Sequence, residues 1–186
     1  SIGGAGGMRD LAAHMADMVR NALDAEAKTI DIRIKNGSRR LLFSVIDDGC
    51  GMDAAEVKRA VSPFFSSKGK DFGFGLALLK TSAEETGGFL RLSSKKDRGT
   101  KVKAVFFKTH PDCKPMGNIP EVILALMQSS PETEIRFTWR SGNRCVRIES
   151  RQLREYKEGK ILILPFKAAA AEEFLKQIYK QKGQSV

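Results

Sequence analysis

Polar side chains recur along one face of the first predicted helix, at spacings of three, four and three residues. The four residues are His14, Asp17, Asn21 and Asp24. Residues of these types are mediocre helix formers, so we expect a function to offset their cost. Asp17 and Asn21 can present a carboxylate and an amide oxygen to one Mg²⁺ ion or one attacking water. An ordinary polar face is the alternative, because short patterns often match by accident.

A second chemical signal is the turn Asp47-Asp48-Gly49-Cys50-Gly51, which follows directly on an apolar strand. The carboxylate of Asp47 can accept the exocyclic amino proton of adenine. Gly49 and Gly51 would let backbone approach a purine where a Cβ would intrude. The alternative is a plain surface turn, since Asp and Gly dominate turns.

A third signal is the basic loop 63–68, which is followed by Gly73-Phe74-Gly75-Leu76 at the start of an apolar helix. Free backbone N–H groups at a helix N-terminus favour phosphate. Rival phosphate motifs fail: the Walker form needs Gly-Lys-Ser/Thr after its glycines, and the dinucleotide form needs glycine where Leu78 stands. Protein-kinase catalytic triplets are absent as well.

In this order the segments resemble the N, G1, F and G2 boxes of the GHKL superfamily, which is named for gyrase, heat-shock chaperone, histidine kinase and mismatch-repair ATPase. The matched segments are 17–25, 47–51, 63–68 and 73–77, with Arg98-Gly99-Thr100 as the late Gly-Thr element. The resemblance covers about residues 10 to 107, and four motifs in order are far more specific than one.

The resemblance implies a Bergerat-type pocket that binds Mg·ATP. Asn21 would hold magnesium and phosphate oxygens, and Asp47 would read the adenine amine. Gly51 and Thr100 would complete the adenine pocket. The further residues that the resemblance places at the nucleotide are Asp24, Gly49, Lys68, Gly73, Gly75 and Leu76, of which Lys68, Gly73 and Gly75 would face the phosphates.

Two functions stay open because Asp17 stands where hydrolytic members of the superfamily carry glutamate, one methylene longer. An enzyme would hydrolyse ATP slowly or transfer phosphate in a regulatory or assembly role, with Asp17 as the base. A non-catalytic switch would use ATP to change a protein contact. Asp24 favours the hydrolytic branch, whereas the Phe-Phe-Ser-Ser-Lys loop favours the histidine-kinase branch.

The elements that must position these residues follow from periodicity. The sequence predicts a helix over 9–27, a hairpin of 30–34 with 41–46, a short helix from Asp53 to Pro63, a helix over 74–85, and a hairpin of 89–93 with 101–107. This αββααββ order predicts an α+β fold, a two-layer sandwich of a Bergerat-type mixed sheet with helices on one face.

After a linker at 110–118, residues 119–186 are expected to form a small C-terminal α+β appendage. Its predicted elements are a helix at 119–127, a hairpin of 135–139 with 145–148, a strand at 161–164 and a closing helix at 168–182. We expect a protein partner here. Its arginines are better explained as the wet side of a sheet than as a nucleic-acid surface. Residues 1–7 are interpreted as a leader or expression scar, and 8–109 as the ATP-binding domain.

Composition narrows the setting without choosing the partner. The 186 residues carry a net charge of +10, which favours anionic ligands in general. Three scattered cysteines and two histidines give no zinc set and suit a reduced cytoplasm. No apolar run is long enough to span a membrane. His14 is expected to be a packed structural histidine, and GHKL ATPases often work as dimers.

The segment His-Pro-Asp-Cys-Lys-Pro-Met-Gly at 110–117 extends the resemblance to a narrower group. The chain is similar to small stand-alone ATP-binding proteins of anaerobic bacteria that accompany iron-hydrogenase genes. That resemblance implies a histidine kinase-like ATPase module with a regulatory or assembly role.

Overall fold

The computed structural model describes residues 10–62, 75–157 and 160–163, and the helical positions 171, 173 and 176. Its helices are α1 (Leu11–Asp24), α2 (Ala54–Ala60), α3 (Gly75–Glu85), α4 (Ile119–Ser129) and the 3₁₀ turn η1 (Ser150–Gln152). Its strands are β1 (Thr29–Asn36), β2 (Arg40–Asp47), β3 (Phe89–Ser94), β4 (Thr100–Phe107), β5 (Glu134–Ser141), β6 (Arg144–Glu149), β7 (Arg154–Lys157) and β8 (Lys160–Ile163). The predicted αββααββ order is confirmed.

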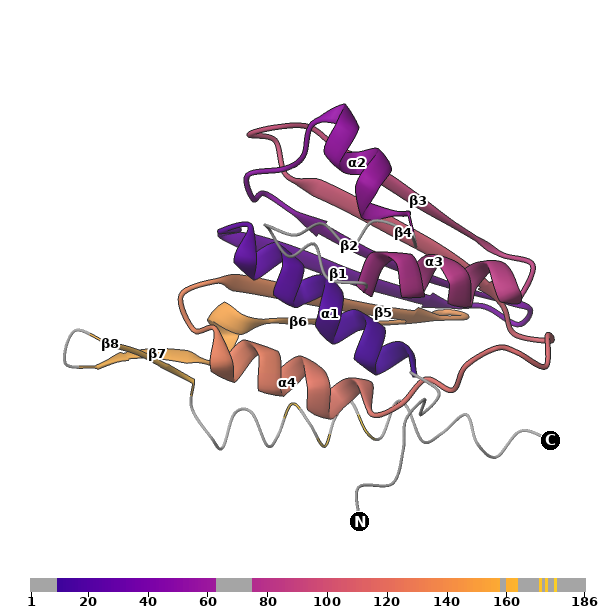
Figure 1. Cartoon of the computed structure of the whole chain (residues 1–186). Coiled ribbons are helices and arrows are strands. Elements are labelled where there is room, and N and C mark those ends of the chain that lie inside the picture. The colour runs from indigo at the N-terminus through magenta and orange to yellow at the C-terminus, as the bar shows by residue number, and fades with distance from the viewer. Residues whose placement is uncertain are drawn as a thin grey trace, which may run out of the picture.

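Six of the strands form one mixed sheet in the order β3-β4-β2-β1-β5-β6. β1 and β5 pair in parallel, and the other neighbouring strands pair antiparallel. The helices α1, α3 and α4 lie together on one side of this sheet (Figure 1). The predicted α+β class, with a mixed sheet and helices on one face, is confirmed.

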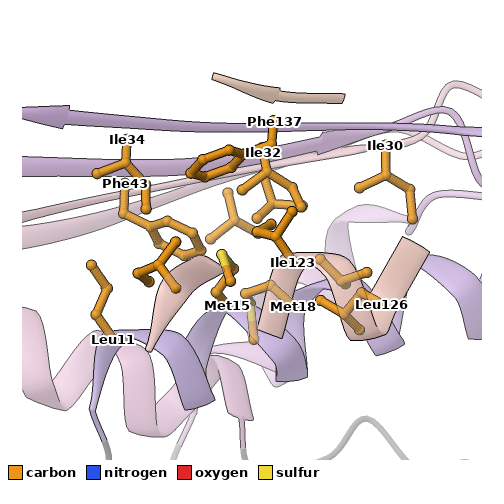
Figure 2. Packing of buried hydrophobic residues seen from close by; sticks show 14 of the residues in the cluster. Leu11, Met15, Met18, Ile30, Ile32, Ile34, Phe43, Ile123, Leu126 and Phe137 are labelled. Carbon is orange, nitrogen blue, oxygen red and sulfur yellow. The ribbon is translucent and has the colours of Figure 1, made fainter. Parts of the chain in front are cut away.

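The core lies between the sheet and these helices. β1 buries Ile30, Ile32 and Ile34 at alternate positions, which is the period of a strand with one covered face. Figure 2 shows these isoleucines pointing toward Met15 and Met18 of α1. The apolar stripe predicted on the first helix is therefore its core-facing side.

The C-terminal third joins the same sheet through β5. Ile32 of β1 stands beside Phe137 of β5 in the parallel register, and both side chains are buried. Helix α4 packs against α1. The sequence predicts residues 119–149 as part of an appendage and does not predict this pairing, because no local pattern encodes contact between strands so distant along the chain.

The predicted linker is packed against the first helix. The backbone N–H groups of Leu11 and Ala12 donate to the carbonyl oxygens of Pro115 and Met116, each at 3.0 Å. These N–H groups belong to the first turn of α1, and the N–H groups of a first turn have no acceptor within the helix itself. The segment therefore completes the N-terminus of α1.

A separate two-stranded sheet is formed by β7 and β8 and extends from the main body (Figure 1). The predicted strand at 161–164 corresponds to β8, whereas β7 was not predicted. Most of the predicted closing helix at 168–182 lies outside the described residues. None of the described helices has the length and apolar character needed to cross a membrane.

Candidate functional site

A pocket of about 370 Å³ opens between α1, the end of β2, α2, the start of α3 and β4. This volume is in the range of small-molecule sites. Of the residues that the sequence assigned to a nucleotide, the pocket brings together Asn21, Asp24, Asp47, Gly51, Leu76 and Thr100. The rest of its wall is formed by Met18, Ala22, Ala25, Val45, Cys50, Met52, Glu56 and Val102.

Asp47 is the last residue of β2 and is fixed in the pocket wall through one oxygen. Its Oδ1 accepts the backbone N–H of Gly49 at 3.0 Å and that of Thr100 at 3.2 Å. No described residue donates to Oδ2. Burial raises the pKa of Asp47 above its ordinary value, outweighing those two hydrogen bonds, and the charge of Asp48 adds to the rise. The arrangement leaves one carboxylate oxygen available to a donor in the pocket.

Asp48 has a different task from its neighbour. Its Oδ1 accepts the backbone N–H groups of Lys28 and Thr29, both at 2.8 Å. Partial burial alone would raise the pKa of Asp48, but the N–H groups of Thr29 and Lys28 outweigh it and lower that pKa. Asp48 therefore fastens the end of β2 to the start of β1, a role that the sequence did not reveal.

Gly49 and Gly51, which follow Asp47, allow other parts of the backbone to approach closely. A Cβ on Gly49 would lie 2.6 Å from the carbonyl oxygen of Ala25, at the end of α1. Gly51 has a φ of +65°, and a Cβ there would lie 2.1 Å from the carbonyl oxygen of Lys95. The sequence predicts that these glycines make room for a purine. In the structure close neighbours within the chain require them, and of the two only Gly51 lines the pocket.

The turn between β3 and β4 holds the loop 48–52 in place. The N–H of Asp97 donates to the carbonyl oxygen of Cys50 at 2.7 Å. The hydroxyl of Ser94 accepts the N–H of Met52 at 2.8 Å and lies 2.8 Å from the hydroxyl of Thr100. Ser94 thus positions Thr100 at the pocket, and no sequence motif marked it.

The polar stripe of α1 is divided between two tasks. Asn21 and Asp24 line the pocket. His14 is buried, and its Nε2 lies 3.2 Å from the hydroxyl oxygen of Ser82 on α3. This contact supports the structural interpretation of His14, which is not part of the pocket wall.

Asp17 lies at the junction of α1 with the start of α3. Its Oδ1 is 3.2 Å from Nη1 of Arg20. A Cβ on Gly75 would lie 3.2 Å from the Cβ of Asp17, so glycine permits the close approach of the two helices. Asp17 is not among the residues that line the pocket.

The phosphate end of the predicted site is only partly described. Lys68 and Gly73 lie outside the described residues, as does the loop 63–68. Gly75 is the first residue of α3, and Leu76 is buried in the pocket wall. Within the described part of the chain, no three His, Cys, Asp or Glu residues gather as a metal site. A single amide such as Asn21 nevertheless suits Mg²⁺, which usually takes one or two protein ligands beside phosphates.

The apolar walls were assigned by sequence to the core alone. Met18 and Ala22 belong to the apolar stripe of α1, and both also line the pocket. Glu56 enters the wall from α2, where it completes the predicted capping box with Asp53. The sequence marked Glu56 as part of a capping box, and that role gave no reason to assign it to the pocket as well.

Comparison with known proteins finds one matching family and several similar proteins. Residues 8–110 match the family described as histidine kinase-, DNA gyrase B-, and HSP90-like ATPase. A putative sensor protein of Shewanella frigidimarina is 30% identical over 105 residues, which are 53% of this chain and 16% of that protein. The DNA mismatch repair protein MutL of Clostridium acetobutylicum is 46% identical over 52 residues, 28% of this chain and 8% of that protein.

The chain thus spans only a small part of the length of these relatives. Among solved structures, the N-terminal domain of a DNA repair protein aligns with a TM-score of 0.49 and 13% sequence identity. That alignment covers 81% of this chain and 54% of the other.

Proposed function

Since the chain belongs to the histidine kinase-, DNA gyrase B-, and HSP90-like ATPase family, which matches residues 8–110, we propose that its pocket binds Mg·ATP. The role that we propose for this binding is slow hydrolysis or phosphotransfer in a regulatory or assembly process. The observation that carries the proposal is Asp47, with Oδ1 held by Gly49 and Thr100 in the wall of a cavity of about 370 Å³.

The base end of the pocket explains a preference for adenine. The available Oδ2 of Asp47 accepts a hydrogen bond from the exocyclic amine of adenine. Guanine carries a carbonyl oxygen at the same position, which would face the carboxylate as a second acceptor. Met18, Val45 and Val102 supply apolar wall for the faces of the base.

The phosphate end is supported by Asn21 and by the start of α3. The amide oxygen of Asn21 is a hard ligand suited to Mg²⁺, and Asp24 stands one turn further along α1. Magnesium, when bound, neutralises charge on the phosphate oxygens. Gly75 begins α3 beside α1, and the free N–H groups of a helix start favour phosphate. Contacts from Lys68 and Gly73 remain predictions.

Turnover depends on Asp17, and here a second function has support. In the structure Asp17 is paired with Arg20 and stands outside the pocket wall. A base for an attacking water must be within hydrogen-bond reach of that water, so hydrolysis requires this ion pair to rearrange. If it does not, the protein is an ATP-dependent switch whose occupancy alters a protein contact.

We place the partner contact in the C-terminal part. Helix α4 packs on α1, which carries Asn21, so a shift of α1 on nucleotide binding would reach residues 119–129 directly. Cys50 and Cys145 are free and exposed, which suits the reducing cytoplasm that we propose as the setting. We also propose that the chain is one of the small ATP-binding proteins that accompany iron-hydrogenase genes.

Isothermal titration with a non-hydrolysable ATP analogue tests the pocket, with and without Mg²⁺ and beside GTP. Asp47→Asn should weaken binding roughly tenfold to a hundredfold, because a hydrogen bond to a charged acceptor contributes about 1.5–3 kcal/mol. Asp31→Asn is the matched control, since Asp31 lies on β1 away from the pocket. Absence of binding by the wild type, or equal loss in both variants, would reject the proposal.

A further inference from the structure

The face of the six-stranded sheet opposite the helices, here called the open face, is strongly basic. Its residues alternate along each strand with those that face the helices. No helix among the described residues covers this face (Figure 1). Nine of its side chains are basic: Arg33, Lys35, Arg40, Arg91, Lys101, Lys103, Arg136, Arg140 and Arg147. Three are acidic: Asp31, Glu134 and Glu149.

The acidic residues of the open face are already engaged. Asp31 lies 3.7 Å from Arg33 and 3.8 Å from Arg136. Glu149 lies 2.7 Å from Nε of Arg147, and Glu134 lies 3.5 Å from Arg154. The remaining cations have no ion pair with a described residue, and they are Lys35, Arg40, Arg91, Lys101, Lys103 and Arg140.

Two pairs of these cations stand directly opposite each other. Arg91 of β3 faces Lys103 of β4, and Lys35 of β1 faces Arg140 of β5. Like charges at opposite positions of a sheet are destabilising. The row through Arg91 and Lys103 continues across the sheet to Arg147 at the far edge, about 24 Å away at ordinary strand spacing. An anionic surface laid on this row would offset the repulsion.

Apolar side chains lie among the cations. Leu42 and Ile46 of β2 are half-buried on the open face, and Leu42 stands opposite Lys35. Cations and aliphatic groups together match a protein interface, which combines an apolar centre with a polar rim.

The aromatic rings of this face argue against a nucleic-acid strand. The guanidinium carbons of Arg40 and Arg91 lie 5.1 Å from the ring centroids of Phe107 and Phe89, respectively. Each of these rings therefore has one face occupied by a guanidinium group of this chain, whereas single-strand binding gains from open rings on which bases stack.

We propose that the open face docks an acidic protein surface, whose carboxylates pair with the unpaired cations and whose apolar side chains cover Leu42 and Ile46. A second copy of this chain is a poorer match than an acidic partner, because two chains that each carry a net charge of +10 repel each other. The docking is independent of the nucleotide pocket, which opens on the helix side of the sheet.

Fluorescence anisotropy on the full chain tests this docking with three labelled probes of equal charge: a peptide of alternating glutamate and leucine, polyglutamate, and duplex DNA. The test variant is Arg91→Gln with Lys103→Gln. The control is Lys58→Gln with Arg59→Gln, a pair of exposed cations on α2 that removes the same charge. We expect the glutamate–leucine peptide to bind more tightly than polyglutamate. The test variant should lower the affinity for this peptide about tenfold, whereas the control variant should leave it unchanged.

The same variants give a second readout. The thermal midpoint of the test variant should change little, because relief of the repulsion between Arg91 and Lys103 offsets the loss of the contact between Arg91 and the Phe89 ring. If the substitutions at Arg91 and Lys103 disturb folding, the variant Lys35→Gln with Arg140→Gln removes the other opposed pair instead. It should lower the affinity for the peptide to a similar extent. Equal loss in the α2 control would show a net-charge effect, and tighter binding of DNA than of the peptide would assign the face to nucleic acid. Either result overturns the proposal.

Discussion

The Nε2 of His14 lies 3.2 Å from the hydroxyl oxygen of Ser82, and both side chains are buried. This contact joins α1, which carries Asn21, to α3, which begins with Gly75 beside Asp17. The two helices that border the pocket are therefore connected through a polar contact within their apolar interface. One member of the polar stripe serves this interface, and Asn21 and Asp24 serve the pocket.

Ser82→Ala should lower the free energy of unfolding by about 1–3 kcal/mol, because it leaves a buried imidazole nitrogen without its hydrogen-bond partner. Urea unfolding measures this change. Ser93→Ala removes an exposed serine hydroxyl on β3 and is the matched control. Equal stability of the two variants would mean that the His14–Ser82 contact contributes nothing.

The raised pKa of Asp47 predicts an unusual pH dependence of nucleotide binding. Burial is its main cause, and the ionised form is the one that we propose to accept a hydrogen bond from the adenine amine through Oδ2. As the pH is lowered, affinity for the ATP analogue should fall before an ordinary aspartate would protonate, near 3.8. Titrations across a pH series should show a flatter profile for Asp47→Asn. Parallel profiles for the two proteins would contradict this account.

The contribution of Asp47 to stability has the opposite sign. Because its pKa is higher in the folded state than in the unfolded state, the folded state is favoured by protonation. This contribution is present below the unfolded pKa and is lost as the pH rises through the folded one. Asp47→Asn should therefore be at least as stable as the wild type at neutral pH, which urea unfolding checks.

Asp48→Ala should destabilise the protein by about 1 kcal/mol at neutral pH, since the carboxylate that accepts from Lys28 and Thr29 is exposed and its hydrogen bonds are partly replaced by water. The lowered pKa of Asp48 makes this stabilisation present above 3.8 and lost as the pH falls through the folded value. Unfolding curves should converge with those of the wild type in acid. A difference that persists there would point to a cause other than the charge.

Local patterns predicted the N-terminal fold and six of the residues that line the pocket. Alternation of Ile30, Ile32 and Ile34 revealed a strand, and the capping box at Asp53 fixed the start of α2. Asp47 and Asn21 were predicted as nucleotide contacts because few residue types meet a purine amine or Mg²⁺, and both line the pocket. These features depend on neighbours along the chain, which a sequence displays directly.

Features that depend on distant neighbours were missed. The register of β1 with β5 and the placement of Thr100 by Ser94 arise from packing between segments far apart. The close approach of Ala25 to Gly49 was also not predicted, because only the folded chain brings the two residues together. A sequence shows that a glycine is needed without showing what approaches it.

Asp17→Asn should lower ATP turnover roughly a hundredfold to ten-thousandfold if Asp17 is the general base, while affinity for the analogue stays within a few-fold. A coupled phosphate-release assay measures turnover. Arg20→Gln removes the ion pair seen at 3.2 Å, and should raise turnover if that pair restrains the base. Negligible turnover in the wild type would favour the switch over the enzyme.

A chain that ends at residue 110 should be much less stable than the full chain. It lacks β5, so one edge of β1 would be unpaired and Ile32 would lose its neighbour Phe137. Exposed strand edges also invite association. Urea unfolding and size-exclusion chromatography of the two proteins check this prediction. An equal unfolding midpoint would show that residues 8–109 form an independent domain.

The contact of Leu11 and Ala12 with Pro115 and Met116 determines when α1 can be completed during synthesis of the chain. The ribosome releases the start of α1 long before the carbonyl groups that complete it. Until residue 116 emerges, the N–H groups of Leu11 and Ala12 lack these acceptors, and β1 is not yet paired with β5. The nascent chain therefore completes the helix and the sheet that border the pocket only after β5 has been synthesised.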